Sequence, residues 1–223
     1  MTAASIRARV RAEMTDEIKA AARRHLAADG ANLSLRAVAR ELGMVSSAVY
    51  RYFASRDDLL TALIIDAYDA VGAAAERAEA AIDRTDLRGR WLAVCHGVRQ
   101  WALDNPHEYA LIYGSPVPGY QAPQDTIPPA TRIPVLIGAI LRDGYGSGDL
   151  PAGDPLPEPL SAELTRVADV VAAGIPPQLM ARGMTAWTQL FGMLSFELFG
   201  QFNNVIDNRT EFFDHQLRAV FPG

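Results

Sequence analysis

The sequence has a single cysteine, Cys95, among its 223 residues. One cysteine excludes an internal disulfide and any zinc site built from several cysteines, so a small buried apolar side chain is its simplest interpretation. No apolar run approaches the roughly 18 to 20 residues that a membrane-spanning helix needs, and the opening stretch lacks the apolar core of a signal peptide. We therefore expect a cytoplasmic protein with no membrane partner.

The sequence also lacks a recognisable catalytic pattern. Its four histidines are scattered, with no pair at metal-ligand spacing, so we expect neither a metal nor another cofactor. His96 directly follows Cys95, and neighbours on a helix point about 100° apart, which disfavours a nucleophile and base pair. The glycines near residue 145 lack the lysine and hydroxyl of a phosphate-binding loop. The sequence therefore predicts that the protein is not an enzyme.

Strand alternation and internal repeats are absent as well, whereas helical periodicity recurs along the chain. Hydrophobic residues make up 49% and charged residues 21%, which is typical of a globular protein. The length suits one large or two modest domains. We predict an all-α fold.

Charge is distributed unevenly along the chain, whose formal net charge is −5. Residues 1–56 carry ten Lys or Arg and five Asp or Glu, a charge of +5, so the remainder carries −10. This asymmetry indicates a small basic module attached to a larger acidic body, although one solvated basic helix face would have the same effect.

The basic segment contains three helical patterns. The first is an apolar stripe with a period of four that ends near Asp29 and Gly30, formed by Val10, Met14, Ile18, Ala22 and Leu26. A short helix follows, with Ser34 as its N-cap and Gly43 just beyond its end. After this glycine, Val45, Ala48, Val49, Tyr52 and Phe53 share one side of a second short helix.

Two short helices joined at a glycine form a helix-turn-helix, and the second helix presents its outer face. On that face lie Ser46, Ser47, Tyr50 and Arg51. Serine allows close approach to a sugar-phosphate surface, a tyrosine hydroxyl donates to phosphate, and arginine pairs with phosphate or a guanine edge. The geometry alone leaves a helix pair without DNA as an equal alternative.

The stretch LSLRAVARELGMVSSAVYRYFASRDDLL, residues 33–60, closely resembles the DNA-binding region of the tetracycline-repressor (TetR) family of bacterial regulators. The resemblance rests on the alanine-rich helix 35–42, Gly43, the run 50–53 and the start of the next helix at 55–60. It implies a DNA-binding transcriptional regulator. The residues that it assigns to DNA contact are Ser34, Arg36, Ser46, Ser47, Ala48, Tyr50, Arg51, Tyr52, Ser55 and Arg56.

Within that set the resemblance implies different roles. Ser46, Ser47 and Ala48 match the start of the recognition helix, which faces base edges, and Arg56 stands where the family often has a phosphate-binding lysine. The ring of Tyr52 lies at the core margin on a helical wheel. Arg36 and Arg51 could also be ordinary solvated charges.

A long helix of about 25 residues begins at Ser55, with acidic residues in its first turn. It would span nearly 40 Å and connect the basic module to the body, so it is the candidate lever. We accordingly divide the chain into a DNA-binding domain, residues 1–54, and an effector-binding and dimerisation domain, residues 55–223.

The body is predicted as helices over 87–103, from Pro106 onward and over 131–142. Proline and glycine crowd the stretches 114–130 and 143–159, which we expect to be long loops of functional or mobile character. A regulator with aromatic helices and long loops should contain a ligand cavity. Candidate contacts to a small apolar or aromatic effector are Trp91, His96, Trp101, Tyr109, Tyr113, Trp187 and Phe191. The first five are equally well explained as core.

The helix expected from about residue 176 is apolar on nearly every side, which indicates burial in a subunit interface. With the amphipathic helix after it, it would form a four-helix contact around a two-fold axis. The expected interface residues are Trp187, Leu190, Leu194, Phe196, Phe199, Phe213 and Leu217. This tail looks like the TetR subgroup with a Trp-His-Gly signature, although Phe191 stands in place of the histidine.

The predicted function is a ligand-responsive homodimeric repressor that binds palindromic operator DNA and is released by a small molecule. Two other classes stay open. A ligand-independent architectural DNA-binding protein would share the basic module without needing a cavity, and a small α-helical enzyme would need catalytic residues that the sequence does not show.

Overall fold

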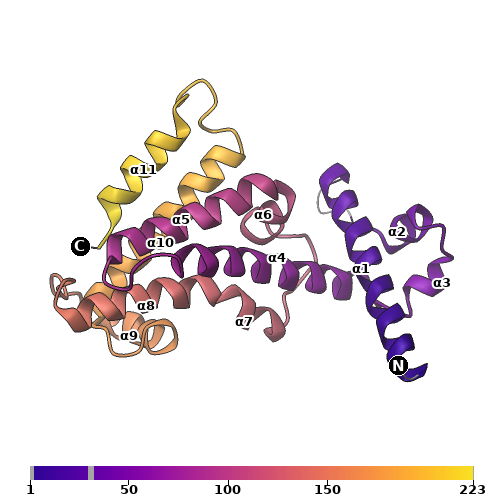
Figure 1. The fold of residues 1–223 in the computed structure, drawn as a ribbon, viewed down its shortest axis with the longest axis horizontal. Coiled ribbons are helices and arrows are strands. Elements are labelled where there is room, and N and C mark those ends of the chain that lie inside the picture. The colour runs from indigo at the N-terminus through magenta and orange to yellow at the C-terminus, as the bar shows by residue number, and fades with distance from the viewer. Residues whose placement is uncertain (1–2, 30–32, 223) are drawn as a thin grey trace. The chain divides into compact units, whose positions relative to one another are not determined.

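The computed structural model describes residues 3–29 and 33–222. Across these residues the chain forms eleven α-helices, one short 3₁₀ helix and no strand, which confirms the all-α prediction. The helices divide into two compact units, Met1–Ala67 with His107–Thr126 and Tyr68–Pro106 with Ile127–Gly223. We call them the N-terminal unit and the C-terminal unit; their helices are labelled in Figure 1.

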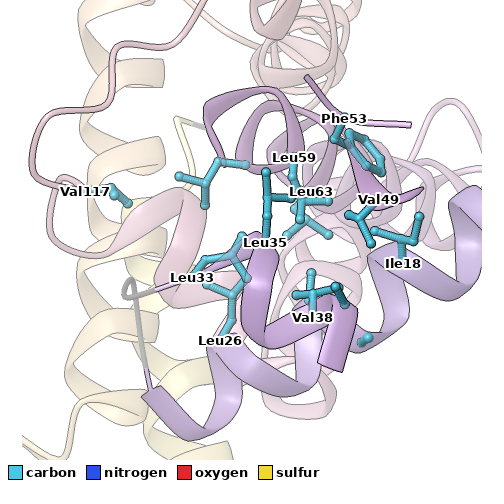
Figure 2. Close-up of a cluster of buried hydrophobic side chains, with 14 residues drawn as sticks. Ile18, Leu26, Leu33, Leu35, Val38, Val49, Phe53, Leu59, Leu63 and Val117 are labelled. Carbon is cyan, nitrogen blue, oxygen red and sulfur yellow. The ribbon is translucent and has the colours of Figure 1, made fainter. Parts of the chain in front are cut away.

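The N-terminal unit surrounds a single buried apolar cluster. Its elements are α1 (Ala3–Asp29), α2 (Leu35–Glu41), α3 (Ser46–Val49), the start of α4 (Arg56–Glu79), most of α6 (Pro106–Tyr113) and the 3₁₀ helix η1 (Gln124–Thr126). Ile18 of α1, Val38 of α2, Val49 of α3 and Leu59 of α4 expose no surface in this cluster (Figure 2). Each helix therefore contributes its apolar stripe to the same core.

The turn between α2 and α3 depends on Gly43. Its φ of +64° lies in the left-handed region, which residues with a Cβ rarely adopt. The Met44 N–H donates to the Ala39 carbonyl at 2.8 Å, and the Leu42 N–H donates to Val38, so the last carbonyls of α2 are satisfied. The predicted helix-turn-helix is confirmed. Its second helix is shorter than the pattern indicated, because residues 50–52 form a hydrogen-bonded turn.

The first helix extends well before the apolar core. Ile18 and Ala22 are fully buried, Met14 is half-buried, and Val10 is exposed. Each step of four residues rotates by about 40° around a helix, so the predicted stripe drifts away from the core at its N-terminal end. The helix end predicted at Asp29 and Gly30 agrees with the last residue of α1, while Gly30 itself lies outside the described residues.

The predicted long helix is α4, which has 24 residues. Ser55 caps it, because its hydroxyl accepts a hydrogen bond from the Asp58 N–H at 3.0 Å, and Asp57 and Asp58 lie in its first turn. The helix is shared between the units, with Ala67 the last residue in one and Tyr68 the first in the other. The compact units thus divide the chain within α4, whereas the domains predicted from sequence meet at residues 54 and 55.

Part of the first predicted loop folds onto the helix-turn-helix. Val117 is buried in the apolar cluster of the N-terminal unit (Figure 2). Leu111 and Tyr120 are partly buried and pack against this cluster. The hydroxyls of Tyr120 and Thr61 form a hydrogen bond of 2.9 Å. The prolines and glycines of this stretch therefore shape a packed segment, and the loop ends in η1 and α7 (Ile127–Ala130).

The C-terminal unit is built around the apolar helix near the end of the chain. Its remaining elements are α5 (Leu87–Asp104), α8 (Arg132–Ser147), α9 (Glu158–Val171), α10 (Pro177–Leu198) and α11 (Arg209–Val220). α10 packs against all of α5, α8, α9 and α11, which explains its many apolar residues. No described helix combines the length and apolar character that crossing a bilayer requires.

The bounds predicted for the second loop, residues 143–159, are wrong at both ends. α8 continues to Ser147 and α9 begins at Glu158. Gly144 lies inside α8, where a Cβ would come within 2.6 Å of Leu150 and 2.9 Å of Leu87. This glycine serves close packing rather than a turn, and sequence reasoning could not separate the two uses.

Candidate functional site

The outer face of α3 gathers the side chains that the sequence predicted to contact bases and phosphates. Val49 is buried and fixes the inner face of the helix, while Ser47, Tyr50 and Arg51 are exposed. Ser46 and Ala48 are half-buried at the start of the helix. We call Ser46, Ser47, Ala48, Tyr50 and Arg51 together the recognition face.

Two further predicted contacts lie at the start of α2. Ser34 has extended backbone angles and occupies the N-cap position, but its hydroxyl makes no capping hydrogen bond. The predicted cap is therefore a backbone cap only, and the exposed hydroxyl stays available to a phosphate oxygen. Arg36 is exposed in the first turn of the same helix.

The remaining predicted DNA contacts have structural partners. Tyr52 is half-buried against the apolar cluster, as its place on the helical wheel indicated. Arg56 is half-buried, and its Nε donates to the Leu33 carbonyl at 3.0 Å. Arg56 therefore also holds Leu33, the residue before the N-cap of α2, and Ser55 caps α4.

The aromatic residues predicted to contact a ligand are divided between the two units. Tyr109 and Tyr113 belong to the N-terminal unit, where their ring centroids lie 5.2 Å apart. Trp91 belongs to the C-terminal unit, exposes 1% of its surface and donates from Nε1 to the Leu217 carbonyl at 3.0 Å. Trp101 is buried in the same unit.

His96 of the C-terminal unit is half-exposed on α5, where Nε2 lies 2.8 Å from a carboxylate oxygen of Asp214. Its ring centroid lies 5.7 Å from that of Phe213. Next to it, burial raises the pKa of the Cys95 thiol well above its usual value, so this thiol stays protonated and unreactive at neutral pH. The predicted interpretation of Cys95 as a buried apolar residue is confirmed.

The C-terminal unit contains an apolar cavity of about 210 Å³ between α8, α9 and α10. Its lining residues are Thr131, Pro134, Ile137, Gly138, Leu141, Val167, Val171, Met180, Gly183, Met184 and Trp187. Of the predicted ligand contacts, the cavity wall includes Trp187. Phe191 packs beside it, with ring centroids 5.5 Å apart.

Sequence reasoning missed most of this cavity because it missed α9. The helix has apolar residues at Leu160, Leu164, Val167, Ala168 and Val171, a spacing that predicts a helix face. Glycines bring the walls together: a Cβ at Gly138 would overlap the Val171 carbonyl, and one at Gly183 would come within 2.5 Å of Leu141. Such close approaches depend on tertiary packing.

The residues predicted for a subunit interface separate into two groups. Leu190, Leu194, Phe213 and Leu217 are buried inside the subunit's own core. Phe196 and Phe199 are exposed, with 52% and 45% of their surfaces accessible, and Trp187 is half-buried beside the cavity. A partner could therefore reach the phenylalanines and not the four core residues, which the sequence pattern could not distinguish.

These features define a helix-turn-helix protein of the regulatory class, with a recognition face in one unit and an apolar cavity in the other. The family model described as bacterial regulatory proteins, tetR family, matches residues 18–63. The model described as tetracyclin repressor-like, C-terminal domain, matches residues 91–220. The chain belongs to the TetR family of DNA-binding transcriptional regulators.

Relatives support this membership along the whole chain. The HTH-type transcriptional regulators Rv1816 of Mycobacterium tuberculosis and Mb1846 of Mycobacterium bovis are each 38% identical over 202 residues, covering 89% of this chain and 86% of the relative. The crystal structure of the putative regulatory protein SCO4313 has 32% identity and a TM-score of 0.82, covering 96% of this chain and 98% of that one. Assignment to the Trp-His-Gly subgroup stays a prediction.

More distant structures share the fold. PfmR of Thermus thermophilus, a TetR-family regulator, has 18% identity and a TM-score of 0.61 over 92% of this chain and 97% of its own. RolR, solved in complex with resorcinol, has 18% identity and a TM-score of 0.51 over 95% and 89%.

Proposed function

We propose that this regulator is a cytoplasmic repressor that binds palindromic operator DNA as a homodimer and leaves it when a small apolar molecule binds. One observation carries the proposal: a single chain joins an exposed recognition face to an apolar cavity in a second unit. DNA binding alone requires the first feature and not the second. The cavity therefore favours a regulator that senses a ligand.

The recognition face supports reading of the major groove. Ser46 and Ser47 at the start of α3 are small enough to let the backbone approach base edges, while Tyr50 and Arg51 can reach phosphates or a guanine edge. Two copies of α3 in a symmetric dimer would enter successive major grooves about 34 to 36 Å apart. That spacing predicts an operator of two inverted half-sites.

The exposed side of α10 supports the dimer. Its accessible residues recur every three or four positions, which places them on one stripe: Thr185, Thr188, Gly192, Phe196 and Phe199. Large exposed phenylalanines are typical of a subunit contact. Among the described residues, no heavy atom from outside the neighbouring helix backbone lies within 4 Å of a Cβ placed on Gly192, so a second helix could come close there. Sedimentation should show a wild-type dimer and a Phe196→Glu monomer; a monomeric wild type would contradict the proposal.

The cavity indicates the class of effector. Apolar cavities of about 150 Å³ are known to admit benzene, so about 210 Å³ suits one ring with short substituents. Two methionines and the half-buried Trp187 would contact such a ring favourably. RolR, which shares only the fold, was solved with resorcinol, a molecule of this size class.

A route from the cavity to the DNA-binding unit is provided by α8. Ile137, Gly138 and Leu141 line the cavity, and Arg132 at the start of the same helix binds α4. The Arg132 guanidinium donates to Glu76 at 2.6 and 2.9 Å and to Asp69 at 2.8 Å. Gly72 makes room for it, because a Cβ there would lie 2.8 Å from Arg132 Nε.

A ligand that shifts α8 would therefore move Arg132 and its contacts with α4, the helix that is shared with the DNA-binding unit. The ligand needs to favour the state that does not bind DNA by only ~3 kcal/mol to release most of the protein. The predicted role of α4 as a lever is kept in this proposal.

Filling the cavity tests the sensing role. Phenol, toluene and resorcinol would be titrated against wild-type protein bound to DNA obtained by selection from a random pool, with release followed by fluorescence anisotropy. Val171→Trp should fill the cavity, keep DNA affinity and abolish release. Val170→Trp, its exposed neighbour outside the cavity wall, should respond as wild type does. Equal responses of the two variants would contradict the proposed site.

The competing class is an architectural DNA-binding protein. It would bind DNA with a salt dependence and little sequence preference, and none of the probes would release it. No further observation in the described residues favours it over the regulator.

A further inference from the structure

Part of the positive charge of the N-terminal unit is already paired with carboxylates of the same unit. Lys19 lies 2.8 Å from Asp66, and Arg23 lies 2.7 Å from both Asp66 and Glu108. Arg24 pairs with Glu41 at 2.6 Å. These pairs leave the exposed arginines as the source of attraction for an anionic partner.

The exposed arginines include three near the start of α1, namely Arg7, Arg9 and Arg11. Arg11 is tied to the end of the recognition helix. Its Nη2 donates to the Arg51 carbonyl at 3.0 Å, and its guanidinium carbon lies 5.1 Å from the centre of the Tyr52 ring. A planar guanidinium can donate within its plane while its flat face lies over a ring, a geometry that the compact ammonium group of lysine does not reproduce.

The helix period places Arg7 beside Arg11. Residues four apart point within about 40° of each other, and Arg7 lies about 6 Å further along the axis. Both share the side of α1 that carries Ile18, which is buried further along the helix in the apolar cluster that also contains Val49 of α3. In Figure 1 the N-terminal end of α1 runs on past α3.

Arg9 lies about 160° away from Arg7 and 3.4 Å from the Glu13 carboxylate. It is therefore on the opposite side of α1 from the recognition face. The two arginines have the same chemistry and exposure but different surroundings, which makes them a matched pair.

We propose that the first turns of α1, residues 5–11, form a second DNA-contacting segment, in which Arg7 neutralises a backbone phosphate and Arg11 anchors the segment to the recognition helix. Arg11 is a positioning residue, because its guanidinium is engaged by Arg51 and Tyr52. The segment extends the charged surface beyond the helix-turn-helix on the side of the recognition face. This inference rests on DNA binding by the protein.

The test compares the salt dependence of DNA affinity. Full-length wild type, Arg7→Ala and Arg9→Ala would be titrated with a fluorescent duplex of ~30 base pairs, long enough for two half-sites, at several potassium chloride concentrations. Each lost phosphate contact lowers the slope of log affinity against log salt by about 0.9, so Arg7→Ala should lower it by about two per dimer. Arg9→Ala should keep the wild-type slope, and equal slopes for the two variants would overturn the proposal.

Arg11→Lys tests the anchor, because lysine keeps the charge and loses the planar guanidinium. We expect the salt slope of wild type with affinity lowered severalfold at every salt concentration; wild-type affinity would overturn the anchoring role. A wild-type protein that binds no duplex at any salt concentration would instead overturn DNA binding itself.

Discussion

Arginine lies mainly at the surface in the N-terminal unit, whereas several arginines of the C-terminal unit lie inside it against carboxylates. Arg36 and Arg51 of the first unit are exposed. In the second unit the Arg90 side chain has 0% exposure and lies 2.6 Å from Glu79, and Arg99 binds Glu197 through two contacts of 2.7 and 2.9 Å.

The two arrangements serve different purposes. Arg90 of α5 joins Glu79 of α4 to Asp143 of α8, so paired charges fix the mutual orientation of three helices. In the N-terminal unit the central cluster is apolar, and exposed cations are left for an external anion. A count of charges along the sequence cannot separate these two uses, because it adds buried and exposed groups equally.

Replacing Arg90 should have the largest effect on stability. Arg90→Met removes the charge and leaves the buried Glu79 with only the more distant Arg84, at 3.7 Å, which should lower the free energy of unfolding by about 3 kcal/mol. Arg88 on the same helix is exposed, and Arg88→Met should change it by less than about 0.5 kcal/mol. Urea denaturation would measure both, and similar losses would break the contrast between the two units.

Replacing Arg51 should change DNA affinity and leave stability nearly unchanged. Arg51→Ala should leave the free energy of unfolding within about 0.5 kcal/mol of wild type, because the side chain is exposed. If the guanidinium pairs with a guanine edge, the affinity for selected DNA should fall by about 1 to 3 kcal/mol. Fluorescence anisotropy would measure the affinity, and a variant that binds as tightly as wild type would remove Arg51 from the recognition face.

Glu76 and Arg132 form a partly exposed ion pair, intermediate between the buried Arg90 and the exposed Arg51. Replacing Glu76 should have the smallest effect of the three substitutions. A hydrogen bond from Arg132 lowers the pKa of the Glu76 carboxyl. A carboxyl with a lowered folded pKa stabilises the fold above its unfolded pKa of about 4.3 and loses this contribution as pH falls through the folded value.

Glu76→Gln should therefore cost at most about 1 kcal/mol at pH 7, since solvent screens the half-exposed carboxylate. The difference from wild type should shrink as pH is lowered below 4. Thermal unfolding across this pH range would show it, and a cost that persists unchanged in acid would assign the effect to packing rather than charge.

The helix-turn-helix could be predicted from the sequence because its signals are local. The glycine after α2, the serine before α4 and the helical spacing around Val49 each act within a few residues. The recognition face followed directly, since burial of Val49 decides which side of α3 is exposed.

The ligand cavity could not be predicted in the same way. It exists where α8, α9 and α10 meet, and the residues that allow this are glycines at close approaches, such as Gly138 and Gly183. Glycine in a sequence indicates a turn as readily as a tight contact, and for this reason the last part of α8, residues 143–147, was predicted as loop. Trp91 was predicted to contact a ligand because it is aromatic, but its indole is buried and donates a hydrogen bond to the Leu217 carbonyl.

The interface residues show a related limit. α10 is apolar on nearly every side, and periodicity alone cannot tell which apolar side packs inside the subunit. The structure places Leu190 and Leu194 inside and Phe196 outside, and this difference depends on where α5, α8, α9 and α11 lie around the helix.

Operator binding by a symmetric dimer can be tested by selecting binding sites from random DNA with the wild-type protein. We expect a two-fold symmetric consensus whose half-site centres are about 34 to 36 Å, or one helical turn, apart. We also expect that Ser47→Ala changes the preferred base at one position in each half-site, because Ser47 lies at the exposed start of α3. Binding without any enriched consensus would contradict operator binding.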